Sequence, residues 1–189
     1  MTEREKMAAG LWYDANYDPE LLAARTRADA LCAAFNAAAP EERRGLLQTL
    51  LPGMEEDVEI LPPFYTDYGA NCRIGGGSFL NRGVYLMDGA PITIGKGCFL
   101  GPNCGLYTAG HPLDPVQRAM GLERALPITL GDNVWLGGHV VVLQGVAIGS
   151  GSVIGAGSVV TRDIPPGVVA AGNPCRVLRP ITEADRIPR

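Results

Sequence analysis

The sequence predicts a mainly β protein that folds as a parallel β-helix, and three features lead to this prediction. An aliphatic residue recurs at every sixth position over long stretches, many of these residues precede a Gly, and the fourth residue after most of them is small or β-branched. The aliphatic positions are Ile74, Leu80, Leu86, Ile94, Leu100, Leu106, Leu130, Leu136, Val142, Ile148, Ile154 and Val160. A period of six fits neither a helix nor a plain alternating strand. It is typical of triangular coils of about 18 residues, with aliphatic side chains stacked inside and glycines at the turns.

The chain divides into three parts. Residues 1–57 are expected to form a small helical cap, with helices over 20–36 and 41–51 that begin near Pro19 and Pro40. We expect residues 58–170 to form the β-helix and residues 171–189 to form a C-terminal tail, with the segment 168–179 covering the open end of the coil. A cap of about 50 residues has too small a core to stand alone, so we expect it to pack on the first coils.

One long segment interrupts the repeat. The step from Leu106 to Leu130 is a multiple of six, so the phase of the repeat is kept while an excursion loop, residues 108–126, leaves the coil. Long loops that project from a regular scaffold commonly carry function. This loop contains His111, one of two histidines in the chain. Neutral imidazole is the usual general base near pH 7, which makes His111 the first catalytic candidate.

Composition restricts the possible partners. The formal net charge of −4 argues against a nucleic-acid surface. The sequence has neither a long apolar run nor the pattern of a signal peptide, so we expect no membrane partner. The five cysteines lack CxxC spacing and are interpreted as packed, reduced thiols of a cytoplasmic protein. We expect no metal site.

Several sequence strings resemble the maltose/galactoside O-acetyltransferase family over essentially the whole chain. They are Glu3–Gly10, Leu11–Asp14, the Gly-His-Pro-Leu-Asp-Pro string from Gly110, Pro127–Gly138, Ile154–Pro166 and Ala171–Arg176. The resemblance implies a left-handed β-helix and transfer of an acetyl group from acetyl-CoA to a hydroxyl of a sugar. It also implies a homotrimer with active sites between subunits.

The resemblance also implies roles for individual residues. His111 matches the catalytic base, and Glu123 matches an acidic residue that could orient its imidazole, although a backbone carbonyl could do the same. Backbone N–H groups near Gly137 and Gly138 could bind the oxyanion. We expect His139 to be an outward-facing strand residue without a role.

The remaining predicted site residues fall into an acceptor group and a coenzyme A group. The acceptor group is Asp14, Arg25, Asp67, Asn81 and Asp88, with Asn81 also expected to act in catalysis. The coenzyme A group is Trp135, Gly138, Ala156, Thr161, Arg162, Arg176 and Arg179, in which the arginines suit phosphates. The chain departs from the family pattern at Leu80, Arg82, Gly83 and Gly89, which affects the acceptor pocket and makes acceptor identity less certain than activity.

Other classes of β-helix protein fit this sequence less well. A γ-class carbonic anhydrase needs three histidine ligands per zinc, and this chain has two histidines in total. A serine acetyltransferase would carry a larger N-terminal helical domain. A xenobiotic O-acetyltransferase and a non-enzymatic β-helix assembly protein remain as alternatives.

Overall fold

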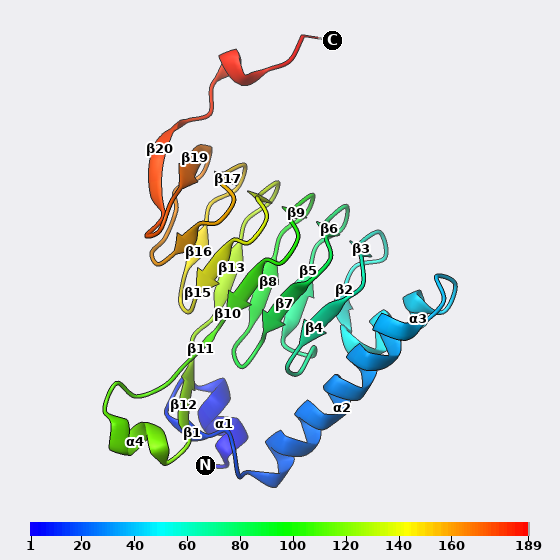
Figure 1. Cartoon of the computed structure of the whole chain (residues 1–189), viewed down its shortest axis with the longest axis vertical. Helices are drawn as coiled ribbons and strands as arrows, with labels where there is room; N and C mark the ends of the chain where they lie inside the picture. Colours follow the sequence, from blue (N-terminus) through cyan, green and yellow to red (C-terminus); the bar gives the residue numbers. More distant parts are fainter. Residues whose placement is uncertain (189) are drawn as a thin grey trace.

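The computed structural model describes residues 1–188 and shows a parallel β-helix with a helical cap beside its first coils (Figure 1). The coils form three parallel sheets, which we call faces. The first face contains β2 (Gly53–Met54), β5 (Cys72–Ile74), β8 (Ile92–Ile94), β13 (Ile128–Leu130) and β16 (Ala147–Ile148). The second contains β3 (Glu59–Ile60), β6 (Phe79–Leu80), β9 (Phe99–Leu100), β14 (Trp135–Leu136), β17 (Val153–Ile154) and β19 (Val168–Ala171). The third contains β4 (Phe64–Thr66), β7 (Val84–Met87), β10 (Gly105–Tyr107), β15 (Val141–Leu143) and β18 (Val159–Val160).

The predicted fold class is confirmed, and so is the role of the aliphatic repeat. All twelve predicted interior positions are buried, from Ile74 at 1% exposed to Val160 at 0%. Their side chains stack from coil to coil, because the strands pair in parallel with each interior residue opposite the next. Removing this apolar surface from water is the main favourable contribution to folding of the solenoid.

The coil length differs from the prediction in the first half of the solenoid. Phe79 pairs with Phe99, so these coils contain 20 residues, whereas Trp135 pairs with Val153, a step of 18. The two extra residues lie at the corner between the third and first faces, where the interior step from Leu86 to Ile94 is eight residues instead of six. This lengthened corner lies beside the cap.

The excursion loop leaves the solenoid from the same corner, one coil later. It contains β11 (Ala109–Gly110), α4 (Pro115–Ala119) and β12 (Leu122–Ala125). Strand β12 pairs antiparallel with β11 on one side and with β1 (Tyr13–Asp14) of the cap on the other. Two strands of the loop thus form a three-stranded sheet with β1, and this sheet joins the cap to the solenoid (Figure 1).

The cap contains three helices, α1 (Glu3–Ala8), α2 (Pro19–Ala37) and α3 (Arg43–Leu50), of which α1 was not predicted. Thr2 caps α1 and Asp18 caps α2 by accepting backbone N–H groups that would otherwise lack partners. Helix α2 packs its apolar side on the first coils, where the ring of Phe35 meets that of Phe64 edge to face at 6.5 Å.

The ends of the solenoid differ in detail from the predicted boundaries. The first coil strand, β2, precedes residue 58 and pairs with β5. At the other end β20 (Arg176–Pro180) pairs antiparallel with β19 and leads to a short 3₁₀ helix, η1 (Glu183–Asp185). Among residues 1–188, no helix combines the length and the apolar character needed to cross a bilayer.

Candidate functional site

His111 follows β11 at the start of the excursion loop and is about half exposed. Its Nδ1 atom lies 2.9 Å from the carbonyl oxygen of Leu122. A carbonyl oxygen only accepts hydrogen bonds, so this contact fixes the proton on Nδ1 and leaves the lone pair on Nε2. The backbone of β12 therefore orients the imidazole with Nε2 available to take a proton.

Glu123 lies on the Nε2 side of this histidine. Its Oε2 atom is 4.0 Å from Nε2 of His111, while its Oε1 atom accepts a short hydrogen bond from the hydroxyl of Tyr13. Burial raises the pKa of Tyr13 far above its usual range, and the hydrogen bond to Glu123 raises it further, so the phenol stays a proton donor. Glu123 is thus held beside Nε2 of His111, and the partner that orients the imidazole in the structure is the Leu122 carbonyl.

Pairing between β1 and β12 brings these groups together across more than 100 residues of sequence. Tyr13 is opposite Glu123, and Asp14 is opposite Leu122. The Asp14 carboxylate accepts the N–H groups of Asn16 and Tyr17, both at 3.0 Å, and so shapes the turn that follows β1. The predicted acceptor residue Asp14 consequently lies one position from the tyrosine that holds Glu123.

A cleft of about 480 Å³ lies between α2 and the third face, and we call it the α2 cleft. It is lined by Arg25, Asp29, Cys32, Tyr65, Thr66, Asp67 and Tyr85. The Tyr85 hydroxyl donates a short hydrogen bond to Asp67. Burial raises the pKa of Asp67, the negative charges of Asp88 and Glu123 raise it further, and the Arg25 charge lowers it. The charges of Arg25 and Glu123 therefore both act on the pKa of Asp67, one of the predicted acceptor residues.

Arg25 is held rigidly at this cleft. Its Nη1 atom donates to the Tyr68 hydroxyl at 2.8 Å, its Nη2 atom donates to the carbonyl of Ala15, and its guanidinium carbon lies 5.9 Å from the centre of the Tyr68 ring. A guanidinium over an aromatic face adds a favourable cation–π contact. The position of Arg25 thus depends on the turn that carries Tyr68.

The buried side chain of Asp88 holds the turn that carries Tyr68 by hydrogen bonds. Its side chain is fully buried and accepts hydrogen bonds from Thr66 Oγ1 and Tyr68 N, both at 2.8 Å, and from Asn71 N at 3.2 Å. Burial raises the pKa of Asp88, whereas these hydrogen bonds lower it. With no exposed surface, Asp88 acts on the α2 cleft by positioning Tyr68.

Tyrosines are the site residues that sequence reasoning missed. Besides Tyr13 and Tyr68, the rings of Tyr65, Tyr85 and Tyr107 follow one another along the outside of the third face, with centroid separations of 6.5 and 5.9 Å. One signal was available, because Tyr65 and Tyr85 occupy the same outward position of successive coils.

The predicted coenzyme A residues lie on the second face and beyond it. Trp135 is exposed at 54% and continues an outward aromatic row formed with Phe79 and Phe99. At the following corner Gly137 leaves no room for a side chain, since a Cβ there would lie 2.6 Å from the backbone nitrogen of Ala156. The N–H of Gly137 donates to Ile154, which leaves Gly138 as the oxyanion candidate of the pair.

The predicted phosphate-binding cations are exposed near the C-terminal end. Thr161 and Arg162 follow β18, and Arg176 and Arg179 lie on β20. Both Arg179 terminal nitrogens bond to Asp185, at 2.8 and 2.7 Å, and this pair lowers the pKa of Asp185 to about 2. A phosphate would therefore have to displace Asp185 from Arg179.

Two predicted residues lie apart from the His111 group. Asn81 follows β6, its side-chain oxygen accepts the Arg82 N–H at 2.8 Å, and the structure of residues 1–188 records no hydrogen bond from it to His111. His139 lies in a turn with φ of 59°, so its predicted place in a strand is wrong. Within the same described range, no cluster of His, Cys, Asp and Glu has the arrangement of a metal site.

Comparison with known proteins agrees with this geometry. Residues 6–54 match the maltose acetyltransferase hexapeptide capping motif, and residues 127–162 match the bacterial transferase hexapeptide repeats. A maltose O-acetyltransferase from Clostridium difficile 630 is 42% identical, covers 97% of this chain and 99% of its own, and superposes with a TM-score of 0.92. The chain belongs to the maltose/galactoside O-acetyltransferase family.

Two further structures similar to this acetyltransferase contain the coenzyme. A hexapeptide-repeat acetyltransferase from Vibrio cholerae O1 biovar eltor, in complex with acetyl coenzyme A, is 40% identical over 97% of this chain and 100% of its own, with a TM-score of 0.87. A galactoside acetyltransferase in complex with coenzyme A is 38% identical over 98% of this chain and 94% of its own, with a TM-score of 0.89.

The structure explains one departure of this acetyltransferase from the family pattern. A Cβ atom at Gly89 would lie 3.2 Å from the Tyr13 hydroxyl and 3.5 Å from Oε1 of Glu123. An acidic side chain at this position would crowd the pair and repel Glu123. Gly89 therefore leaves room for the Tyr13–Glu123 hydrogen bond.

Proposed function

We propose that this protein transfers the acetyl group of acetyl-CoA to a hydroxyl of a sugar, with Nε2 of His111 as general base. The observation that carries the proposal is the hydrogen bond from Nδ1 of His111 to the Leu122 carbonyl, which in the neutral imidazole puts the lone pair on Nε2, the nitrogen that lies nearest to Glu123. A base with its tautomer fixed by the backbone is ready to accept a hydroxyl proton.

The reaction follows from this arrangement. Nε2 takes the hydroxyl proton as the acceptor oxygen attacks the thioester carbonyl, and the negative charge moves to the carbonyl oxygen. The N–H of Gly138 is our candidate donor to that oxyanion. Collapse of the intermediate expels the coenzyme A thiolate, which recovers the proton from His111. The Glu123 carboxylate, 4.0 Å from Nε2, stabilises the imidazolium formed between these steps.

The acceptor is placed at the α2 cleft. Asp67 and Arg25 line this cleft and offer carboxylate and guanidinium partners for sugar hydroxyls, and Asp88 supports Arg25 through Tyr68. Asp14 is assigned to the acceptor from outside the cleft, on β1 opposite Leu122. Charged partners make stronger hydrogen bonds to hydroxyls than neutral ones, which suits a polar, uncharged acceptor.

Acetyl-CoA is placed along the second face and the C-terminal strands. Support comes from the exposed aromatic row ending at Trp135 and from the small residues Gly138 and Ala156 at the next corner. Thr161, Arg162, Arg176 and Arg179 then provide contacts for the phosphates of the nucleotide end. The coenzyme complexes of the two related structures support acetyl-CoA as the co-substrate.

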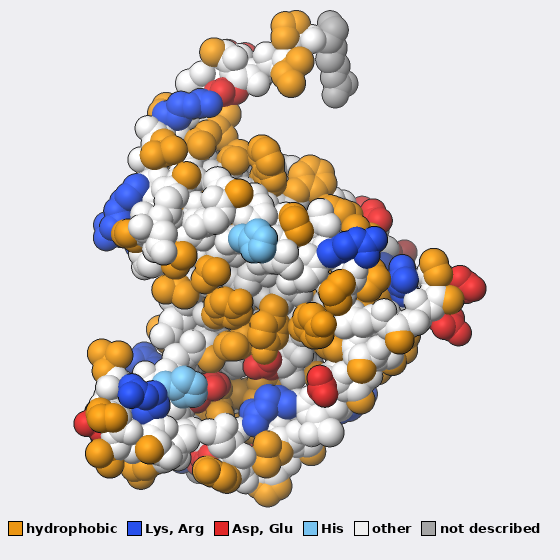
Figure 2. All heavy atoms as spheres, viewed as in Figure 1, with side chains coloured by type: hydrophobic (Ala, Val, Ile, Leu, Met, Phe, Trp, Pro, Cys, Tyr) orange, Lys and Arg blue, Asp and Glu red, His pale blue; other side chains and the backbone are white. Residues whose placement is uncertain are grey.

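We infer that the working assembly is a homotrimer in the cytoplasm, with Asn81 of one subunit completing the His111 site of another. Hydrophobic side chains gather in the middle of the face shown in Figure 2. On the third face, Tyr65 is 47% and Leu143 37% exposed. Such a patch favours burial against another subunit. The five cysteines, all within the described residues, are unpaired and buried, which is typical of a reducing compartment.

The test is acetyl-CoA turnover over a panel of mono- and disaccharides, with chloramphenicol-type hydroxyl acceptors included and coenzyme A release monitored. We expect release above the hydrolysis background with at least one sugar. Release with the antibiotic acceptors alone would overturn the sugar assignment, and no release with any acceptor would overturn the enzymatic one.

The shared site has a separate test. Inactive His111→Ala and Asn81→Ala chains should regain activity when their subunits are exchanged, because some interfaces then carry both native residues. Absence of recovery after exchange has been verified by native mass spectrometry would contradict a site between subunits.

A further inference from the structure

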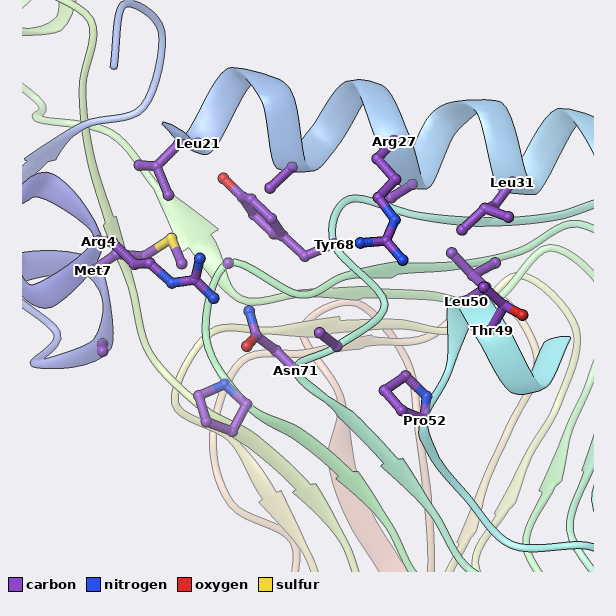
Figure 3. A pocket seen from close by; sticks show the side chains of 16 residues that line it. Arg4, Met7, Leu21, Arg27, Leu31, Thr49, Leu50, Pro52, Tyr68 and Asn71 are labelled. Carbon is purple, nitrogen blue, oxygen red and sulfur yellow. The ribbon is translucent and has the colours of Figure 1, made fainter. Parts of the chain in front are cut away.

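A second cavity, of about 530 Å³, lies between the cap helices and the first coils, and we call it the cap pocket (Figure 3). Helix α2 lines both cavities, but with different residues. The residues of α2 that line the cap pocket are Leu21, Ala24, Arg27, Ala28 and Leu31. Its volume falls in the range of small-molecule sites. The proposed acetyl transfer uses none of this space.

The walls of the cap pocket combine an apolar body with positive charge. Apolar side chains from α1, α2, α3 and the first coils make up most of it: Met7, Leu21, Leu31, Leu50, Pro52 and Pro91. Polar groups come from Arg4, Arg27, Thr49, Tyr68 and Asn71 (Figure 3). Within residues 1–188, no Asp or Glu lines it, although the chain as a whole carries a net charge of −4.

The two guanidinium groups enter the pocket from different elements. In Figure 3, Arg27 descends from α2 and Arg4 reaches in from the side of α1. Arg4 pairs with Glu20 at 2.7 Å, but both side chains are more than half exposed, and such surface pairs exchange at little cost. No carboxylate of the described residues lies within 4.0 Å of Arg27. Arg27 is therefore the cation available to a ligand.

A ligand that matches these walls needs an anionic head and an aliphatic body. A guanidinium pairs with a carboxylate through two parallel hydrogen bonds, and apolar walls favour a chain without polar groups. We propose that the cap pocket is a second binding site, which takes a medium-chain aliphatic carboxylate with its head group on Arg27 and its chain along Leu21, Leu31 and Leu50.

This site shares a wall with the proposed catalytic site. Tyr68 lines the cap pocket with its ring and holds Arg25 of the α2 cleft with its hydroxyl. Gly89 also lines the cap pocket, and its position faces the Tyr13–Glu123 pair. A bound carboxylate thus contacts the residues that position the acceptor side of the active site without entering it.

The test is isothermal titration calorimetry of the full chain with sodium octanoate, without acetyl-CoA or sugar present. We expect saturable binding of one octanoate per chain, and binding of 1-octanol at least about tenfold weaker, because the neutral alcohol lacks the charge-assisted bonds to Arg27. Since the measurement needs no turnover, its outcome is independent of the proposed acetyl transfer.

Variants separate the cap pocket from general hydrophobic binding. Arg27→Gln, an exposed position, should weaken octanoate binding about tenfold or more. The matched control Arg73→Gln, on an exposed strand position outside the pocket, should leave it unchanged. Ala24→Phe should abolish binding by filling the cavity. No saturable binding of octanoate, or equal affinity in wild type and a folded Arg27→Gln protein, would overturn the proposal.

Discussion

Replacing Tyr13 by Phe removes its hydroxyl and little else, so this substitution tests how the hydroxyl contributes to the His111 site. Tyr13 is fully buried, and its hydroxyl donates to Oε1 of Glu123. Tyr13→Phe keeps the ring and its packing and deletes that single donor. Glu123 is then left with its carboxylate only 18% exposed and without the partner that fixes it beside His111.

The expected magnitudes follow from this contact. A hydrogen bond to a charged group contributes about 1.5–3 kcal/mol, so Tyr13→Phe should lower the free energy of unfolding by about that amount. We also expect kcat to fall by roughly tenfold, because a carboxylate that can turn toward water stabilises the imidazolium less. The KM for acetyl-CoA should not change, since the residues proposed to bind the coenzyme lie on the second face and the C-terminal strands.

The assay combines urea unfolding with steady-state kinetics on Tyr13→Phe, Glu123→Gln and the double variant. Positioning through Glu123 requires that the loss of kcat from Tyr13→Phe nearly disappears in the Glu123→Gln background. Tyr17→Phe, at a residue that is 72% exposed, is the matched control and should resemble wild type. Additive losses of kcat in the double variant would refute the argument that Tyr13 acts through Glu123.

Three further predictions test other parts of the site. His111→Ala should lower kcat by roughly 10²–10⁴ with His139→Ala near wild type, and equal activities would contradict the assignment of the base. Arg176→Gln should raise the KM for acetyl-CoA, and added salt should shrink the difference from wild type; a changed acceptor KM instead would argue against a phosphate contact. Burial raises the folded-state pKa of Asp67, so its charge costs stability above that pKa and the cost vanishes as pH falls below the unfolded value. Asp67→Asn should therefore raise Tm at pH 7 but not near pH 3 while impairing acceptor use, and a Tm gain independent of pH would contradict this cause.

The sequence predicted the interior of the solenoid far better than its exterior. Interior positions such as Leu100 and Leu136 are buried and stacked in the same way in every coil, so each requires an aliphatic residue and the repeat is visible in the sequence. Outward positions carry no such constraint. The tyrosines of the third face were therefore overlooked, although Tyr65 and Tyr85 stand at the same place in successive coils.

Part of the candidate site could be predicted from the sequence, whereas the contacts that Tyr13 and Tyr68 make could not. His111 and Glu123 share one loop, and a contact between them could be expected. The hydrogen bond from Tyr13 could not, because it depends on how the cap docks and on the pairing of β1 with β12. The burial of Asp88 likewise depends on the lengthened corner, whose extra residues have no counterpart in a strict period of six.

The excursion loop leaves the ladder of the solenoid unbroken. Phe99 pairs directly with Trp135, and Gly105 with Val141, as though the residues between the two coils were absent. The strands that flank the loop are thus hydrogen-bonded whatever its length, and doubling a loop adds only about 0.6 kcal/mol of closure entropy. The excursion loop, which carries the proposed catalytic base, is therefore attached to the solenoid without interrupting its strand pairing. Exchanging residues 108–126 would leave the pairing of the coils intact, and the contact that a new segment would have to keep is the pairing of β12 with β1 of the cap.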